Sequence, residues 1–463
     1  MKILVFAKIK IIYDFTVYNL QLFINKKQKK MIEKNCDNFF IIEKIFFHNF
    51  AKMLSYFSRY KTLPPFFAEK PSKNVGIIVV IPCYDDDFVF QTLDSLNVAE
   101  KPNCDVEIII VVNSAENTDI NIINKNNITF NNLFSLNKSK YFFNILPILI
   151  ENVPKKFAGV GNARKTGMDE AVRRFAEINQ NNGIIASLDS DCLVAKNYFT
   201  EIEKYFVINS KSDCCTINFQ HNFDKNLYSE QEIYGCRLYE TYLRYFRLSL
   251  AATGFPYCFH TIGSCFAVKA LCYSKLGGIS RRQAGEDFYF LHKAAQATKV
   301  GRITEKIVFP APRLSDRVPF GTGREIQKII ENEQYMVYNF ELFKILKTFF
   351  ETFENIFETK YVDLKLFPQE VINFTNEKKI MEIFAETISN TKHKEQFIKR
   401  LYSKFDAFFV IRFLNFFNTS KSFPPKELFE EIKKLLDYYK VSVSDFSQEN
   451  IYKIIYNLDM END

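Results

Sequence analysis

Two aspartates that could hold a metal ion, Asp189 and Asp191, directly follow the apolar run GIIASL at 183–188. On an extended segment, side chains at positions i and i+2 point to the same side, and carboxylate oxygens are the ligands that hard divalent cations prefer. A cation held in this way can bridge two phosphate groups. Asp-x-Asp is also common in turns, but its place directly after a predicted buried strand favours a site for Mg²⁺ or Mn²⁺.

A second candidate site lies upstream, where basic residues open a predicted helix. Arg164 and Lys165 fall in the first turn of the segment GNARKTGMDEAVRRFAEI, which starts at Gly161. Cations at this position oppose the helix dipole, at a cost of about 0.3 to 1 kcal/mol each, and are favoured when an anion binds there. Gly159, Gly161, free backbone amides and Arg164 would together form a cradle for a diphosphate. The alternative is a helix that starts further upstream.

Polar residues also stand at the ends of two other apolar runs. Pro82, Tyr84 and Asp86 follow or end the run VGIIVVIP, and Asn113 follows the run VEIIIVV. In open α/β sheets, ligands bind at the carboxyl ends of the strands. We therefore expect these side chains to lie close to the Asp-x-Asp segment.

An acidic pair, Glu286 and Asp287, opens another predicted helix directly after Gly285. Acids in a first helical turn are ordinary partners of the helix dipole. Their position alone therefore favours a structural role.

The elements that must position these residues alternate between strands and helices. The runs at 75–82, 106–112 and 183–188 are apolar on both faces, as buried parallel strands are. The first two runs start about thirty residues apart, which is the length of a βαβ unit. Helical spacing of apolar residues at 88–96 and 161–178 separates the runs. The pattern predicts an α/β fold with a mostly parallel sheet covered by helices on both faces.

Changes in composition divide the chain into three parts. We expect a basic N-terminal extension and linker at 1–70, an α/β domain at 71–324, and a helical C-terminal module at 325–463, where Lys, Glu and Phe are frequent. Two stretches of the α/β part have weaker patterns. The Asn-rich stretch 113–140 is predicted as a loop with one short element, and 195–260 as irregular apart from a helix at 230–250.

The charge is unevenly distributed along the 463 residues. Of the net charge of +7, residues 1–61 hold twelve Lys or Arg against four Asp or Glu. The rest of the chain has no basic excess, so nucleic acid is not an expected partner. The basic segment could bind an anionic membrane surface. The alternative is an extension that precedes a true start at Met31 or Met53.

The sequence contains no clear targeting signal. The apolar run at the start is too short and too soon interrupted by lysines for a signal peptide, and no stretch is long and apolar enough for a membrane-spanning helix. Ten scattered cysteines without Cys-x-x-Cys pairs indicate neither a zinc site nor a disulfide framework. We expect a cytoplasmic protein, at most peripheral at the inner face of the membrane. With 50 Phe and 24 Tyr, no single aromatic residue indicates a binding platform.

The order of the segments resembles glycosyltransferase family 2, whose catalytic domain has the Rossmann-like GT-A fold. The resemblance covers roughly residues 75 to 315, and it is carried by the order and spacing of six segments rather than by any one of them. These are IVVIPCYDD, EIIIVVNS, GNARKTGMDEA, ASLDSD, GSCFAVKALCYSKLGG and GEDFYFLHKA.

The resemblance implies a role for each candidate residue. It places Arg164 at the diphosphate, Asp191 at the metal, and Asp287 beside Glu286 as general base near the acceptor. One departure concerns the nucleobase: the family often has Asp-Asp-Gly-Ser after its second strand, whereas this chain has Asn113 followed by Ser and Ala. A uracil preference is therefore not carried over. The remaining residues implied in binding the nucleotide sugar are Pro82, Tyr84, Asp86, Asp189 and Ser190.

By resemblance, the chain is an inverting glycosyltransferase that uses Mg²⁺ or Mn²⁺ and a nucleotide-sugar donor. Its acceptor would be a glycan or glycolipid, in bacterial surface polysaccharide or glycolipid synthesis. Acceptor choice would lie in loops around 220–262 and 313–324, where Arg313, Arg317 and Arg324 are either contacts for a phosphate-bearing acceptor or ordinary surface arginines. His260 in the first loop is more typical of a structural residue than of a ligand.

Two other functions stay open, and one is disfavoured. A sugar nucleotidyltransferase would need a Gly-rich, Arg-containing loop after the first strand, which is not found here. A degenerate, non-catalytic binding protein could use the helical module as an interaction surface. A dinucleotide oxidoreductase is disfavoured because the first strand is followed by Cys-Tyr-Asp-Asp-Asp, without a glycine to admit a pyrophosphate.

Overall fold

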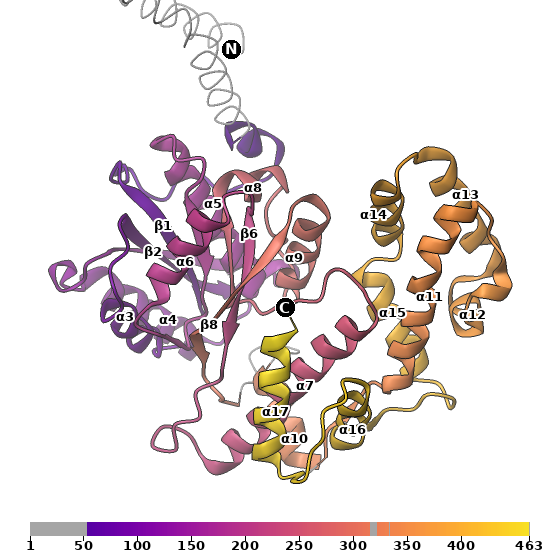
Figure 1. The fold of residues 1–463 in the computed structure, drawn as a ribbon. Coiled ribbons are helices and arrows are strands. Elements are labelled where there is room, and N and C mark those ends of the chain that lie inside the picture. Colours follow the sequence, from indigo (N-terminus) through magenta and orange to yellow (C-terminus); the bar gives the residue numbers. More distant parts are fainter. Residues whose placement is uncertain (1–52, 315–321, 333, 463) are drawn as a thin grey trace, which may run out of the picture.

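The computed structural model describes residues 53–314, 322–332 and 334–462. Figure 1 shows an α/β unit and, beside it, a group of C-terminal helices. The basic segment 1–52 lies outside the described residues, so its membrane association stays a prediction. In the described part of the chain, no helix is long and apolar enough to cross a membrane.

The α/β unit is built on an eight-stranded sheet with the order β3-β2-β1-β4-β7-β6-β8-β5. Neighbours from β3 to β4 are parallel, as are β6 and β8, whereas β7 is antiparallel to both its neighbours and β5 to β8. The strands are β1 (Val75–Cys83), β2 (Asp105–Ala115), β3 (Asn144–Val153), β4 (Ile184–Ser187), β5 (Cys192–Val194), β6 (Cys214–Phe219), β7 (Phe266–Lys269) and β8 (Val300–Pro310).

Helices cover both faces of the sheet. One face packs on α3 (Val89–Asn97), α4 (Ile120–Ser135) and α6 (Tyr198–Ile208), and the other on α5 (Val160–Glu177), α8 (Ala270–Lys275) and α9 (Glu286–Ala297). In β1, Ile77, Val79 and Ile81 belong to the first core and Ile78 and Val80 to the second, because successive side chains of a strand alternate between faces. The predicted α/β class, with a mostly parallel sheet and helices on both faces, is confirmed.

The prediction of a loop at 113–140 was wrong. β2 continues to Ala115, and α4 is a regular helix of 16 residues whose first turn is capped by Asp119. Only Asn126, Thr129 and Leu133 of α4 are buried. Because two of these three are polar, the helix carries almost no hydrophobic periodicity. The following strand β3 was also missed, so the strand before Asp189 is the fourth in the chain and not the third.

The stretch 195–260 is more regular than its composition indicated. It contains α6, β6 and α7 (Glu230–Ala252), and α7 confirms the helix predicted at 230–250. α7 begins with a capping box, in which the side chains of Ser229 and Glu232 each accept from the other's backbone N–H. Its 23 residues run from the α/β unit to the C-terminal helices.

The C-terminal region is helical, as predicted, with one short pair of strands that was not predicted. β9 (Met336–Val337) pairs antiparallel with β10 (Lys426–Glu427). A phenylalanine-rich core joins these helices to α7 through Leu238, Tyr245 and Leu248. The helices are α10 (Thr322–Asn332), α11 (Phe340–Thr359), α12 (Gln369–Thr375), α13 (Glu377–Asn390), α14 (Lys394–Lys404), α15 (Ala407–Asn418), α16 (Leu428–Tyr438) and α17 (Gln448–Glu461).

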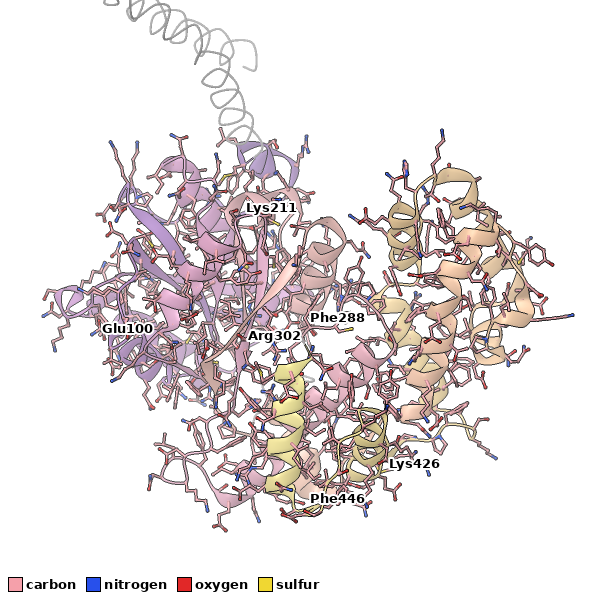
Figure 2. The ribbon with its side chains drawn as sticks, viewed as in Figure 1. Glu100, Lys211, Phe288, Arg302, Lys426 and Phe446 are labelled. Atoms are coloured by element: carbon pink, nitrogen blue, oxygen red, sulfur yellow. The ribbon has the colours of Figure 1, made fainter. Side chains whose placement is uncertain are left out.

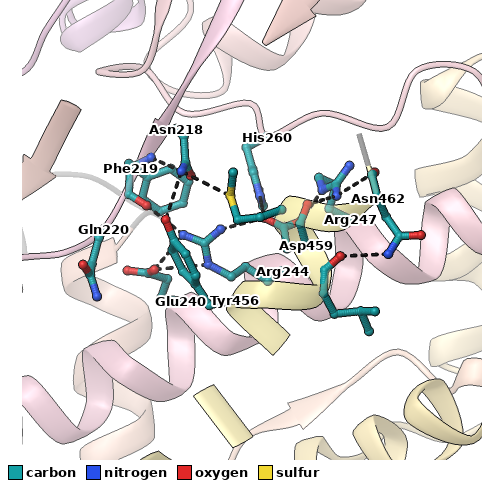
Figure 3. A network of polar contacts seen from close by, with 12 residues as sticks. Asn218, Phe219, Gln220, Glu240, Arg244, Arg247, His260, Tyr456, Asp459 and Asn462 are labelled. Atoms are coloured by element: carbon teal, nitrogen blue, oxygen red, sulfur yellow. Dashed lines mark hydrogen bonds and ion pairs between the residues drawn. The ribbon is translucent and has the colours of Figure 1, made fainter. Parts of the chain in front are cut away.

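The C-terminal helix α17 is anchored by a closed network of polar contacts, shown in Figure 3. Asp459 is fully buried and accepts from Arg244 of α7 at 2.6 Å and from Arg302 of β8 at 3.0 Å. It also pairs with Arg247 and lies 3.2 Å from Nε2 of His260. The last helix of the chain is therefore bound to both α7 and the sheet.

Residues 53–59 form a further helix that packs on the second core. Tyr56 is 1% exposed, and its hydroxyl donates to Asp169 Oδ1 at 2.6 Å. Lys165 donates to the same hydroxyl at 2.8 Å. The end of the segment predicted as an extension thus contributes to the core of the α/β unit.

Candidate active site

A cavity of about 770 Å³ opens at the carboxyl ends of β1, β2 and β4. From β1 the chain continues outward through β2 to β3 and then returns to the other side of β1 as β4. Such a reversal of strand order leaves a crevice beyond the strand ends, which is where open α/β sheets bind their ligands. The volume is in the range of small-molecule and cofactor sites.

The ten residues predicted to bind the donor or the metal or to act in catalysis line this cavity, whereas Gly161 of the predicted diphosphate cradle does not. They come from five separate segments, which the fold brings together at one edge of the sheet. The residues are Pro82, Tyr84, Asp86, Asn113, Arg164, Asp189, Ser190, Asp191, Glu286 and Asp287. Their individual roles stay predictions.

Arg164 is surrounded by groups that accept hydrogen bonds. Its side chain is buried, its Nε donates to Ser187 Oγ at 2.9 Å, and its guanidinium pairs with Asp189 and Glu286. Gly263 makes room for it, because a Cβ at that position would lie 2.6 Å from Arg164 Nη2. The guanidinium that we predicted at a diphosphate thus already neutralises two carboxylates.

Arg313 forms a second bridge between carboxylates. Its Nε donates to Asp191 Oδ2 at 3.1 Å, and its Nη2 pairs with Asp86, which is 1% exposed. Ser190 Oγ donates to the same carboxylate at 2.7 Å. We had considered Arg313 for a phosphate-bearing acceptor, but it pairs with the expected nucleotide and metal residues. Of the other two arginines considered, Arg324 is exposed and Arg317 lies outside the described residues.

The Asp-x-Asp segment is a turn and not the extended segment that we assumed. The N–H of Cys192 donates to the carbonyl oxygen of Asp189 at 3.2 Å, and Thr92 Oγ1 donates to the carbonyl of Ser190 at 2.8 Å. The turn forms because β5 starts only one residue after Asp191. Asp189 and Asp191 are therefore placed by this turn, with side chains that are 35% and 24% exposed, and each meets a different arginine.

The residues present fit a divalent cation. Both carboxylates of the turn line the cavity and offer hard oxygen ligands. Among the residues that the structure describes, no group of three His, Cys, Asp or Glu side chains could hold a metal ion. A cation here would therefore rely on these two aspartates and on oxygens from a phosphate and water, which is the usual manner of Mg²⁺.

The acidic pair divides into a structural and a cavity-facing member. Glu286 is 2% exposed and pairs with Arg164, whereas Asp287 is only partly buried and accepts from the N–H of Phe288 at 2.7 Å. Burial, with the negative charge of Glu286 next in size, raises the pKa of Asp287 to about 7 despite the opposing charge of Arg164. A carboxyl group with a pKa near neutrality is suited to accept a proton in catalysis.

Two of the solved structures that resemble this chain were determined with a bound nucleotide sugar. No family model and no curated protein matches the sequence. The crystal structure of S. aureus TarS 1-349 in complex with UDP-GlcNAc is 12% identical, with 71% of this chain and 90% of that chain covered and a TM-score of 0.35. Mannosyltransferase PcManGT from Pyrobaculum calidifontis, in complex with GDP-Man and Mn²⁺, is 12% identical, with coverages of 91% and 97% and a TM-score of 0.34. At these TM-scores the likeness does not establish a shared fold.

The two histidines nearest the cavity have structural partners. His221 lines the cavity, and its Nδ1 lies 2.8 Å from Glu240 Oε2. His260 is buried beside Asp459, and burial lowers its pKa to about 4. The segment after His260 contributes Thr261 to Ser264 to the cavity wall, so the histidine supports the wall from behind.

Several cavity residues were missed from the sequence. Ser187 lies in the segment ASLDSD and Gly263 opens the segment GSCFAVKALCYSKLGG, but their contacts with Arg164 were not predicted. A wall of Tyr239, Tyr242 and Tyr335 was hidden by the abundance of aromatic residues in this chain. The only signal for the first two tyrosines is their i, i+3 spacing on the predicted helix 230–250, which is equally typical of a core face.

Proposed function

We propose that this chain is an inverting glycosyltransferase that moves a sugar from a nucleotide-sugar donor to a hydroxyl acceptor. The observation that carries the proposal is the position of Asp287. This carboxyl group, with its pKa raised to about 7, lines the same 770 Å³ cavity as Asp86, Asp189 and Asp191. A base and an oxygen-rich cation site in one cavity match the needs of an acceptor hydroxyl and a departing diphosphate.

The donor would bind along the strand ends. Pro82, Tyr84, Asp86 and Asn113 would hold the nucleoside, and Asn113 is positioned by a hydrogen bond from its Nδ2 to the carbonyl of Gly159 at 3.3 Å. Asp189 and Ser190 would contact the ribose side. Val160, the first residue of α5, lines the cavity, and the backbone amides of this helix N-terminus would be suited to a diphosphate.

Asp191, with Asp189 beside it, would hold the divalent cation. Bound Mg²⁺ or Mn²⁺ would supply positive charge against the charge that builds up on the departing nucleoside diphosphate. Side chains of the protein position these carboxylates. Arg313 contacts both Asp86 and Asp191. Ser190 donates to Asp86, and Arg164 pairs with Asp189. The arginines also reduce the repulsion between a diphosphate and these carboxylates.

In the reaction, Asp287 would take the proton from the acceptor hydroxyl. The acceptor oxygen forms a bond to the anomeric carbon from one face, and the bond from that carbon to the phosphate oxygen breaks on the opposite face. The electron pair leaves with the nucleoside diphosphate, and the anomeric configuration is inverted. Glu286 pairs with Arg164 and, through its charge, contributes to the raised pKa of Asp287.

We further propose that the product belongs to bacterial surface polysaccharide or glycolipid synthesis, at the cytoplasmic face of the membrane. In this proposal residues 1–70 form the basic extension and linker, whose basic part would associate with the membrane, 71–324 the GT-A catalytic domain, and 325–463 a helical module. The division is supported by the change in element type near α10, although α7 shares its core with the module.

Product analysis tests the proposal directly. The purified chain is incubated with UDP-, GDP-, CDP- and dTDP-sugars and Mn²⁺, and the released nucleotide is separated by ion-exchange chromatography. Release of a nucleoside diphosphate, from slow hydrolysis even without an acceptor, supports sugar transfer. Pyrophosphate from a sugar phosphate and a nucleoside triphosphate would indicate a nucleotidyltransferase instead. Neither product, together with no nucleotide binding, would indicate a non-catalytic protein.

A further inference from the structure

One half of the cavity has a wall of tyrosine rings. Tyr239 and Tyr242 come from α7, and Tyr335 stands just before β9; all three line the cavity and are only partly buried. The rings of Tyr242 and Tyr335 are 5.2 Å apart and nearly perpendicular, at 88°, so they form a corner of two aromatic faces. Phe288, the residue after Asp287, completes the wall.

The polar groups of this half are a carboxylate and hydroxyl groups, which form hydrogen bonds and carry no positive charge. Glu325 lines it, and Tyr335 donates to Glu325 Oε2 at 3.2 Å. Tyr239 hydrogen-bonds Thr322 and lies close enough to Glu325 and Asp287 for their charges to help burial raise its pKa. Among the described residues that line the whole cavity there are six carboxylates and two arginines, and each arginine is paired with two of these carboxylates.

These observations point away from a phosphate-bearing acceptor. A second phosphate in the tyrosine-walled half would face Glu325 and Asp287 with no described lysine or arginine to compensate its charge. Burying an uncompensated anion beside carboxylates is strongly unfavourable. A sugar ring is better matched, because its apolar C–H faces pack on aromatic rings and its hydroxyls donate to carboxylates and tyrosine oxygens.

The C-terminal module holds this wall in place. The N–H of Leu428, at the start of α16, donates to the carbonyl of Tyr335 at 3.0 Å, and the next residue after Tyr335 begins the β9–β10 pair. On the other side, Phe408 of α15 packs edge-on against Phe288, with ring centroids 5.0 Å apart. Figure 2 shows Phe288 between the α/β unit and the C-terminal helices.

We infer that the tyrosine corner of Tyr239, Tyr242 and Tyr335, with Phe288 and Glu325, is an acceptor subsite for an uncharged carbohydrate. The C-terminal helical module contributes Glu325 and Tyr335 to this subsite and packs against Phe288 through Phe408, which gives the module a function in substrate selection. The inference rests on the proposed glycosyltransferase function, since it assigns the second substrate of the same cavity.

Saturation-transfer NMR tests the inference without requiring the natural acceptor. The full chain, saturated with the nucleoside diphosphate that it binds, is mixed with maltotriose, cellotriose and N-acetylchitotriose, and in parallel with glucose 1-phosphate and glycerol phosphate. We expect saturation transfer to at least one neutral oligosaccharide and not to the phosphates. Transfer to the phosphates alone, or to no neutral oligosaccharide, would overturn the inference. Nucleotide binding in the same samples would leave the proposed function standing.

Substitutions locate the subsite. Tyr242→Ala and Tyr335→Ala should each weaken oligosaccharide binding roughly tenfold, because a stacked ring is lost. Tyr335→Phe keeps the ring and should retain most of the binding. Tyr361→Ala removes a tyrosine of the same module that is 67% exposed, and should change nothing. Nucleotide affinity should be equal in all four variants, which controls for folding. Equal oligosaccharide affinity in Tyr242→Ala, Tyr335→Ala and Tyr361→Ala would exclude the tyrosine corner as the subsite.

Discussion

Two clusters in this molecule are built from arginines and carboxylates, but one is buried and the other lines a cavity. In the closed cluster around Asp459, Arg244, Arg247 and Arg302 surround two carboxylates, and every charged group is buried or nearly so. In the open cluster, Arg164 and Arg313 face five carboxylates that line the cavity. In the first cluster the charged groups are buried and hydrogen-bonded within the protein (Figure 3), whereas in the second the carboxylates outnumber the arginines and line a cavity.

The two clusters differ in which of their charged groups a ligand can reach. A closed network of buried charges is costly to break and offers nothing to a ligand, so it fixes the position of α17, α7 and the wall behind the cavity. An acid-rich cluster beside a cavity keeps oxygen ligands for a cation and one carboxyl group whose pKa is raised. Arginine and carboxylate content alone does not separate the two clusters, but their balance and exposure do.

The largest effect is expected from Asp287→Asn in the open cluster. The amide cannot accept the proton of an acceptor hydroxyl, so we expect turnover to fall by roughly 10² to 10⁴. Donor binding should be nearly unchanged, because Asp287 is proposed to act on the acceptor hydroxyl and not on the nucleotide. Turnover and nucleotide affinity are measured on the same preparation, and Asp287→Asn with near-normal turnover would remove Asp287 from its proposed role.

Breaking the closed cluster should lower the free energy of unfolding. Asp459→Ala leaves three arginines without a shared carboxylate, and we expect the free energy of unfolding to fall by about 3 to 5 kcal/mol. Glu449→Ala, on the same helix, is the matched control: its carboxylate is exposed and pairs with Lys453, so we expect little change in the free energy of unfolding. Urea unfolding followed by circular dichroism measures both. Equal midpoints would mean that Asp459 is not the anchor of α17.

The cation site of the open cluster is tested by Asp191→Ala. Loss of this carboxylate should weaken Mn²⁺-dependent nucleotide binding on the order of 10- to 100-fold in titration calorimetry. Binding without metal should change less. An unaltered dependence on Mn²⁺ would place the cation elsewhere in the chain.

The smallest effect concerns stability against pH. The pKa of Asp287 is raised from its ordinary 3.8 to about 7 in the folded state, so the folded protein favours the protonated carboxyl group. This preference stabilises the fold fully below pH 3.8, and the stabilisation is lost as the pH rises through about 7. Asp287→Asn removes this loss. We therefore expect its melting temperature to exceed that of the wild type by more at about pH 8 than at about pH 5. An equal difference at both pH values would contradict the raised pKa.

Much of the sheet could be predicted because β1, β2 and β4 bury both faces and therefore appear as unbroken apolar runs. The residues of the candidate site could then be predicted, because the carboxyl ends of neighbouring parallel strands lie at the same edge of the sheet. The helix α4 could not be predicted, because its buried face includes Asn126 and Thr129 and so lacks apolar periodicity.

The partners of the site residues could not be predicted either. Arg313 reaches Asp86 over 227 positions of the chain, and Arg164 reaches Glu286 over 122. Nothing local in the sequence marks such pairs, because they depend on how β8 and α9 are placed against the strand ends. The tyrosine corner was likewise invisible, since α7 and the residue before β9 meet only in the folded chain.

A thermal-shift screen tests most directly whether the open cluster is a nucleotide-sugar site. The purified chain is heated with UDP, GDP, CDP, dTDP and their common sugars, with and without Mn²⁺. A ligand present at a hundredfold its Kd adds about 2.7 kcal/mol to stability. We predict a clear rise in melting temperature with one nucleotide, larger with Mn²⁺ and reduced in Asp191→Ala. No shift with any nucleotide, with or without the metal, would contradict the assignment of this cavity.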